Sequence, residues 1–142
     1  MKKILLMGAG KIGEMITEML AGSGDYHVTV ADISDKALAN MPKYENVKTV
    51  NLNVTNQADL DAEMAGKFAV LSAAPYQITK FIAEAAVRNS VNYFDLTEDV
   101  QCTQRIKAIA QSAIGGQVFM PQCGLAPGFI GILAYSFRQY FD

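Results

Sequence analysis

Three glycines near the amino terminus place the strongest constraint on how this chain can fold. Gly8, Gly10 and Gly13 form the pattern G-x-G-x-x-G between an apolar run, 3–7, and an amphipathic stretch, 12–21. In a tight turn from strand to helix, the first glycine permits the reversal, the second lets the backbone approach a ligand, and the third lets the helix pack on the strand. The pattern therefore predicts a strand, a tight turn and a helix in succession.

The rest of the chain repeats this alternation of short apolar runs and amphipathic stretches. Further strands are predicted over 28–31, 47–52, 68–72, 93–96 and 117–120, and further helices after Ser34 and over 57–65, 77–89, 99–113 and 127–141. Strands that alternate with helices pair in parallel through right-handed crossovers. We expect one α/β domain over 1–142, a Rossmann-type doubly wound parallel sheet of about six strands in the order 3-2-1-4-5-6.

The same pattern predicts helix ends and buried faces. Ser34, Asn56 and Thr97 are short polar residues at the starts of helices, so each is expected to cap one. In the first helix, the apolar residues at three- and four-residue spacing are expected to form one face; they are Ile12, Ile16, Met19 and Leu20.

Composition excludes several classes of protein. Half of the residues (51%) are hydrophobic and 18% are charged, so the chain has enough apolar surface for a core. The net charge of −2 gives no reason to expect nucleic acid or an anionic membrane as a partner. Cys102 and Cys123 match neither a disulfide framework nor a zinc site, so no metal is expected. These features fit a reduced, cytoplasmic setting.

An acid further along the chain indicates a function for the first turn. Asp32 follows Gly13 by 19 residues and ends the second predicted strand. There, its carboxylate can accept hydrogen bonds from the ribose of a dinucleotide whose diphosphate sits on the N–H groups of Lys11 and Ile12. A carboxylate repels a 2′-phosphate and no arginine follows it, so NAD is favoured over NADP, although Lys36 weakens this preference. The alternatives are that the glycines only form a turn and that Lys11 is only a solvated helix residue.

The loops after later strands face the same edge of the sheet. Asn53 and Val54 fit the flank of an adenine, and an ordinary turn fits them equally well. The small residues Ala73, Ala74 and Pro75 let the backbone pass close to a ribose or nicotinamide.

Two further loops follow the fifth and sixth predicted strands. Glu98 is the candidate active-site acid. The alternative is helix capping, with Glu98 and Asp99 in the first turn after Thr97, which explains every acid there except Asp95. Cys123 is not expected to act as a nucleophile, because the single histidine, His27, lies far from it in the predicted fold.

Four segments together resemble the saccharopine dehydrogenase family, of which lysine 6-dehydrogenase and carboxynorspermidine dehydrogenase are relatives. They are 7–13 (MGAGKIG), 72–75 (SAAP), 93–98 (YFDLTE) and 124–128 (GLAPG). The resemblance implies NAD(P)-dependent chemistry on the C–N bond of an amino acid or related amine. It also implies that Gly8, Gly10, Gly13 and Asp32 hold the cofactor, while Glu98 and Gly124 lie near the reaction centre.

The chain is shorter than the members of this family, which carry a second domain for the substrate. We therefore expect the chain to be a fragment that binds cofactor without turnover and lacks a C-terminal domain. Core packing is the simpler explanation for the aromatic and aliphatic residues near its end, although a missing domain or a partner such as a second copy would also account for them; they are Leu133, Tyr135, Phe137, Tyr140 and Phe141.

Two other interpretations stay open. One is a regulatory nucleotide-sensing Rossmann domain of a channel or transporter, in which binding shifts a conformation without catalysis. The 73–75 and 124–128 loops argue against it, because a sensor does not need them. The other is a reductase-like scaffold that has lost its activity.

Overall fold

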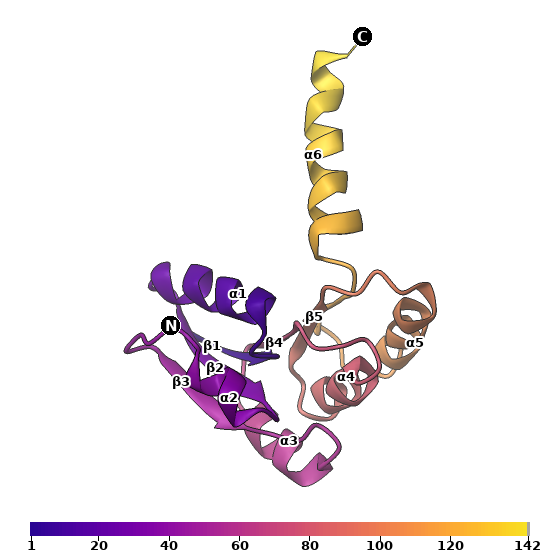
Figure 1. Cartoon of the computed structure of the whole chain (residues 1–142). Coiled ribbons are helices and arrows are strands. Elements are labelled where there is room, and N and C mark those ends of the chain that lie inside the picture. The colour runs from indigo at the N-terminus through magenta and orange to yellow at the C-terminus, as the bar shows by residue number, and fades with distance from the viewer. Residues whose placement is uncertain (142) are drawn as a thin grey trace.

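The computed structural model describes residues 1–141 and contains one parallel sheet with helices around it (Figure 1). The strands are β1 (Lys2–Met7), β2 (Tyr26–Asp32), β3 (Val47–Asn51), β4 (Ala69–Ser72), β5 (Asn92–Asp95) and β6 (Phe119–Met120). They lie in the order β3-β2-β1-β4-β5-β6 and all neighbours pair in parallel. The predicted fold class and strand order are confirmed.

The helices connect these strands in the predicted sequence. They are α1 (Lys11–Gly22), α2 (Asp35–Ala39), α3 (Gln57–Met64), α4 (Thr79–Arg88), α5 (Val100–Ala110) and α6 (Ile130–Phe137), with irregular turns over Leu125–Phe129 and Arg138–Tyr140 around α6. Ser34 and Asn56 cap α2 and α3 as predicted, through the backbone N–H groups of Ala37 and Asp59. The cap of α5 is Asp99 and not Thr97, because the Asp99 carboxylate accepts the N–H of Cys102.

Two apolar clusters lie on opposite faces of the sheet. Leu6 and Val30 face α1 and α2, whereas Leu5 and Val70 face α3, α4 and α5. Adjacent residues of β1 point to opposite faces because side chains alternate along a strand. The first half of the sheet is therefore covered on both sides.

The second half of the sheet is covered on one side only, in the part of the chain that the structure describes. Leu6, Leu71, Phe94 and Met120 lie in register across β1, β4, β5 and β6 on the face that α1 covers. Leu6 is fully buried, but Met120 is 49% exposed because no described helix packs over it. This apolar row therefore ends at a solvent-exposed side chain.

Helix α6 points away from the sheet instead of packing on it (Figure 1). No residue of α6 is buried, and Tyr135 and Tyr140 are 75% and 73% exposed. Core packing of this helix, the simpler expectation from the sequence, is therefore wrong. The aromatic side chains Phe137 and Phe141 are also exposed, and only Leu133 is partly covered.

The buried face of α1 agrees only in part with the expected one. Ile16 and Leu20 pack against the core as predicted, whereas Ile12 and Met19 are 54% and 69% exposed. The most deeply buried positions of the helix are Gly13, Thr17 and Ala21. Small residues occupy this face because α1 packs very close to the turn that precedes it. A Cβ atom at Gly13 would overlap the carbonyl oxygen of Gly8.

Candidate dinucleotide-binding site

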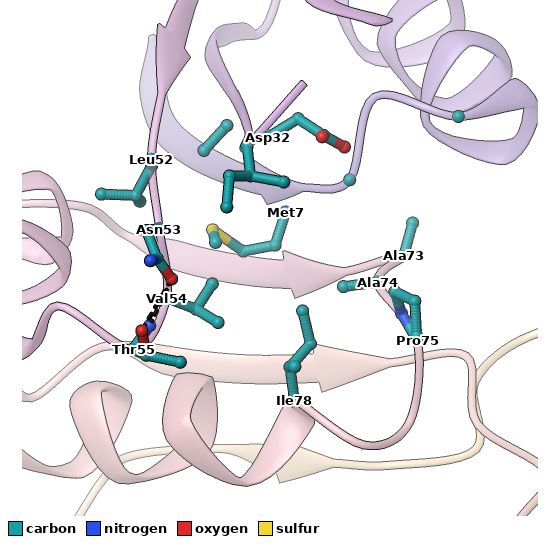
Figure 2. A pocket seen from close by; sticks show the side chains of 14 residues that line it. Met7, Asp32, Leu52, Asn53, Val54, Thr55, Ala73, Ala74, Pro75 and Ile78 are labelled. Carbon is teal, nitrogen blue, oxygen red and sulfur yellow. Dashed lines mark hydrogen bonds between the residues drawn. The ribbon is translucent and has the colours of Figure 1, made fainter. Parts of the chain in front are cut away.

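A cavity of about 520 Å³ opens at the carboxyl ends of β1 to β4, where open α/β sheets bind ligands (Figure 2). The predicted residues that line it are Gly8, Gly10, Asp32, Asn53, Val54, Ala73, Ala74 and Pro75. Sequence reasoning did not single out Met7, Ala31, Ile33, Leu52, Thr55 and Ile78, which also line it. Most of these missed residues adjoin a predicted motif, so the signal for them was their position at a strand end.

The glycine turn forms one wall of the cavity. Gly8 has a positive φ of 108° and donates its N–H to the carbonyl oxygen of Ala31 at 2.8 Å. A Cβ atom there would lie 2.9 Å from the carbonyl oxygen of Ala73, so only glycine fits between the two loops. At Gly10, by contrast, nothing lies within 4 Å of an added Cβ, and the space beside its backbone is open to the cavity.

The amino end of α1 carries no side-chain cap. Its N-cap residue is Gly10, whereas α2, α3 and α5 are capped by the side chains of Ser34, Asn56 and Asp99. The first N–H groups of a helix lack partners within the helix and carry a partial positive charge. At α1 they are therefore available to a diphosphate, and Gly8 and Gly10 line the cavity beside them.

Asp32 links the glycine turn to the loop after β2. Its Oδ2 accepts the N–H of Ala9 at 2.8 Å, and its Oδ1 accepts the N–H of Ser34 at 2.8 Å. The residue is half-buried and borders the cavity, with the neighbouring Ala31 and Ile33 (Figure 2). Each carboxylate oxygen can accept a second hydrogen bond, so Asp32 both holds the turn in place and keeps capacity for a ligand hydroxyl.

The loop after β3 supplies a polar and an apolar contact side by side. Asn53 Oδ1 accepts hydrogen bonds from the backbone N–H of Thr55 at 3.0 Å and from its hydroxyl at 2.8 Å. The Nδ2 group is a donor, so Asn53 suits a ring nitrogen of adenine, which is an acceptor. Val54 points into the cavity across from Ile78 (Figure 2).

The loop after β4 closes the other side of the cavity. Ala73 donates its N–H to the carbonyl oxygen of Met7 at 2.8 Å, which fixes this loop beside the glycine turn. Ala74 and Pro75 follow it along the rim (Figure 2). Because their side chains are small, the backbone borders the cavity directly.

Several predicted residues lie outside the cavity wall. Lys11, Ile12 and Gly13 form the start of α1. This end of the helix faces the cavity, but none of the three residues is part of the cavity lining. Gly124 packs on Leu96, with an added Cβ 3.2 Å from the carbonyl oxygen of Leu96.

The start of α5 agrees only in part with the expected capping. Glu98 lies before α5 and not in its first turn, and it is exposed and away from the cavity. The structure therefore does not bring Glu98 together with the glycine turn.

Asp95, the acid that capping did not explain, is fully buried at the end of β5. Its Oδ1 accepts the N–H groups of Thr97 and Gln122, and its Oδ2 accepts the hydroxyl of Tyr93 at 2.8 Å. Burial, followed by the charge of Asp95, raises the pKa of Tyr93 above its ordinary value. Asp95 therefore joins the β5 loop to the β6 loop.

The thiol of Cys123 belongs to the same structural network. It donates to the carbonyl oxygen of Asp95 at 3.0 Å, and burial raises the pKa of Cys123. A thiol kept protonated is a poor nucleophile, which agrees with the expectation from the sequence. Within residues 1–141, no cluster of potential ligands could hold a metal ion, and no helix is long and apolar enough to cross a membrane.

Comparisons with known proteins identify the family of this domain. Residues 4–119 match the family model described as the saccharopine dehydrogenase NADP binding domain. Saccharopine dehydrogenase [NADP(+), L-glutamate-forming] of Saccharomyces cerevisiae is 28% identical over 131 residues, which are 89% of this chain and 28% of that protein. The mitochondrial alpha-aminoadipic semialdehyde synthase of Bos taurus is 25% identical over 134 residues, 94% of this chain and 14% of that protein.

Solved structures show the same fold. The apo saccharopine dehydrogenase (L-Glu forming) of Saccharomyces cerevisiae superposes with a TM-score of 0.83 at 23% identity, covering 99% of this chain and 31% of that one. The apo scyllo-inositol dehydrogenase of Lactobacillus casei gives a TM-score of 0.70 at 16% identity, covering 98% and 39%.

The chain thus spans less than a third of the length of these two curated relatives. None of these findings supports the alternative of a nucleotide sensor of a channel or transporter. The nucleotide is NAD(P), and the preference between NAD and NADP is a separate question. This chain belongs to the family of saccharopine dehydrogenase NADP-binding domains.

Proposed function

We propose that this chain is the nucleotide-binding part of an NAD(P)-dependent oxidoreductase acting on the C–N bond of an amino acid or related amine. The observation that carries the proposal is the meeting of the uncapped α1 end, the glycine turn and Asp32 around one cavity. When bound, the nicotinamide cofactor supplies the hydride acceptor or donor. The chain itself binds, orients and partly encloses the dinucleotide.

Each part of the cavity has a proposed partner on the dinucleotide. The N–H groups at the start of α1, from Lys11 and Ile12, receive the diphosphate, and Asp32 receives the adenosine ribose hydroxyls. Val54 and Asn53 hold the adenine. Further along the edge, Ala73, Ala74 and Pro75 border the nicotinamide ribose.

Two residues of the later strands are assigned to the substrate side. Glu98 and Gly124 lie beyond the nucleotide cavity, at the ends of β5 and β6. We propose that Glu98 exchanges a proton with the substrate once a substrate domain covers this edge.

The diphosphate assignment is tested at Gly10. Its backbone is in an ordinary region (φ −78°) and an added side chain meets nothing, so Gly10→Leu keeps the fold but fills the space for the phosphates. NADH affinity should fall at least about 100-fold, while the midpoint of thermal unfolding stays unchanged. Gly115→Leu is the matched control, because an added Cβ at Gly115 also meets nothing. Unchanged NADH affinity in Gly10→Leu, by calorimetric titration, contradicts the assignment.

We further propose that NAD(H) binds better than NADP(H), although the family description and the yeast relative's name both print NADP. The Asp32 carboxylate stands where a 2′-phosphate would lie. The N–H of Ser34, which could otherwise bind that phosphate, is already donated to Asp32. A second acid, Asp35, accepts a hydrogen bond from Asn51 in the same loop region and adds to the repulsion.

The preference is tested by exchanging charge at this loop. Asp32→Ala combined with Ile33→Arg removes the repulsion and adds a phosphate-binding cation; Ile33 is 65% exposed, so an arginine fits there. The ratio of NADPH to NADH affinity should rise about 100-fold. Tighter binding of NADPH by the unaltered chain, or an unchanged ratio in the variant, overturns the preference.

A substrate domain outside this chain is also proposed. Helix α6 is exposed, and the apolar row of Leu71 and Phe94 ends at Met120, which is 49% exposed. Both surfaces suit an apolar partner. We expect this chain alone to bind the nucleotide without amine-dependent reduction of NAD. A homodimer is the competing occupant of this surface, and light scattering distinguishes the two.

A further inference from the structure

A second cavity, of about 400 Å³, lies at the amino ends of the strands, opposite the nucleotide cavity. Lys3 comes from the start of β1, His27 from the start of β2, Lys48 from the start of β3, and Lys67 from the residues just before β4. The parallel sheet brings these four residues together because all strand starts share one edge. Nothing in the nucleotide-binding proposal uses this edge.

Lys67 forms the floor of this second cavity. Only 9% of its side-chain surface is exposed, yet its ammonium group has three N–H donors to satisfy. Among residues 1–141, one acceptor lies within hydrogen-bond distance, the hydroxyl of Thr29 at 3.0 Å. The carboxylate of Glu63 is 3.8 Å away, an ionic contact too long for a hydrogen bond. The ammonium group is therefore short of acceptors on the cavity side.

The charge around Lys67 is also only partly balanced. Glu63 is shared between Lys67 and Lys48, whose Nζ lies 3.6 Å from the same carboxylate oxygen. Burial, and then repulsion from Lys48 and Lys3, lowers the pKa of Lys67, while Glu63 raises it. Among the residues that line the cavity the acid is Glu45, which is exposed, and Glu63 lies outside the lining. A buried cation whose neighbours are mainly cations is costly without a further counter-ion.

We propose that this lysine-lined cavity binds a phosphate group, carried by inorganic phosphate or by a small phosphomonoester. A phosphate oxygen at the cavity floor supplies the acceptor that Lys67 lacks, and Lys48 and Lys3 at the mouth balance its remaining charge. Water satisfies hydrogen-bond donors but brings no negative charge, and a metal cation would be repelled by the three lysines. The cavity is larger than the phosphate group alone, so a small ester group also fits.

The experiment titrates the whole chain with inorganic phosphate and, separately, with ribose 5-phosphate, at constant ionic strength set by sodium chloride. Amide chemical shifts of Thr29, Lys48 and Lys67 are followed by NMR. Both ligands should shift these three amides in a saturable way. A lower dissociation constant for ribose 5-phosphate identifies a phosphomonoester as the ligand, and equal constants identify free phosphate.

Two variants remove charge with little loss of volume. Lys67→Met should weaken phosphate binding at least about tenfold and Lys48→Met about threefold, since Lys48 is exposed at the rim. Lys107→Met, an exposed lysine in α5 outside the cavity, is the matched control and should bind as the unaltered chain does. If Lys67→Met does not fold, Lys48→Met still tests the site, because 62% of the Lys48 side chain is exposed.

Absence of a saturable shift at constant ionic strength overturns the proposal, as does equal weakening by Lys48→Met and Lys107→Met. Either result leaves the nucleotide assignment untouched, because NADH affinity is measured at the other end of the sheet. A loss of NADH binding without loss of phosphate binding would, conversely, refute only the proposed function.

Discussion

The turn between β1 and α1 and the turn between β6 and α6 are built alike but have different outcomes. In each turn, an aspartate at the end of the neighbouring strand accepts one N–H from that turn and one from its own loop: Asp32 from Ala9 and Ser34, and Asp95 from Gln122 and Thr97. Asp32 is half-buried beside a cavity, whereas Asp95 is fully buried and its remaining oxygen holds Tyr93. The same hydrogen-bonding arrangement therefore borders the proposed nucleotide cavity in one turn and is enclosed in the fold in the other.

The helices that follow differ even more. Helix α1 returns onto the sheet with Gly13, Thr17 and Ala21 buried, and α6 leaves it with no buried residue. A turn in this fold can therefore be fully braced while the helix that follows it has no surface to pack on. The residues that α1 buries are covered within the described chain, whereas those of α6 stay exposed there.

The largest difference should come from one substitution made in both helices. Gly13→Ala places a methyl group on the Gly8 carbonyl, so we expect a loss of at least about 4 kcal/mol in the free energy of unfolding. Gly131→Ala meets nothing in α6 and should stabilise by less than about 1 kcal/mol. Urea titrations followed by circular dichroism measure both. Equal effects would show that α1 packs no more closely than α6.

A smaller difference is expected between the helices on either side of β6. Ile106 in α5 is fully buried, so Ile106→Ala should cost about 3 kcal/mol of unfolding free energy. Ile132 in α6 is 72% exposed, so Ile132→Ala should change it by less than about 0.5 kcal/mol. A large loss in Ile132→Ala, by thermal unfolding at low protein concentration, would mean that α6 packs on the domain after all.

The smallest effect on stability concerns Tyr93, whose hydroxyl donates a hydrogen bond to the buried Asp95. The raised pKa of Tyr93 means that its proton is lost from the unfolded chain, near pH 10, before it is lost from the folded one. Stability is therefore retained below that pH and decreases by up to about 1.4 kcal/mol per pH unit above it.

Tyr93→Phe separates this effect from other alkaline changes. At neutral pH it should cost about 1 kcal/mol for the lost hydrogen bond to Asp95, and above pH 10 its stability should decrease less steeply than that of the unaltered chain. Urea unfolding at pH 7 and over an alkaline series measures both. Parallel alkaline slopes for the two proteins would exclude Tyr93 as their source.

Much of the fold was predictable because strands and turns carry local signals. The alternation of apolar runs predicted six strands and their order, and Ser34 and Asn56 identified two helix starts correctly. Thr97 failed as a cap because Asp99, two residues later, offers a stronger acceptor to the helix end. Both residues suit the position, and only the geometry of the loop decides between them.

The faces of the helices were harder to predict. In α1, periodicity favoured Ile12 and Met19, whereas the close approach of helix and turn requires small residues. The recurrence of Gly13, Thr17 and Ala21 at four-residue spacing was the signal that could have corrected this. For α6, an apolar sequence indicates burial without indicating the partner, so Tyr135 and Phe137 read as core residues.

The residues of the site were also predictable only in part. The residues of the glycine turn, Asp32 and the 73–75 loop line one cavity because the topology sets their strand ends side by side. Glu98 was placed on the same edge of the sheet by its loop after the fifth strand and by the family resemblance, but it is exposed and away from the cavity. The pattern of strands predicts the edge at which a loop lies and not the direction in which its side chains point.

The place of β1 in the sheet has a consequence for how the protein is made. This strand is synthesised before the other strands of the sheet, yet it pairs on one side with β2 and on the other with β4, which ends at residue 72. Until β4 has been synthesised, the nascent polypeptide carries a β1 edge with no hydrogen-bonding neighbour, beside the apolar side chains of Leu5 and Leu6. Such an edge invites pairing with other chains and is a natural target for chaperones. Half of the domain must therefore be translated before its central strand is protected.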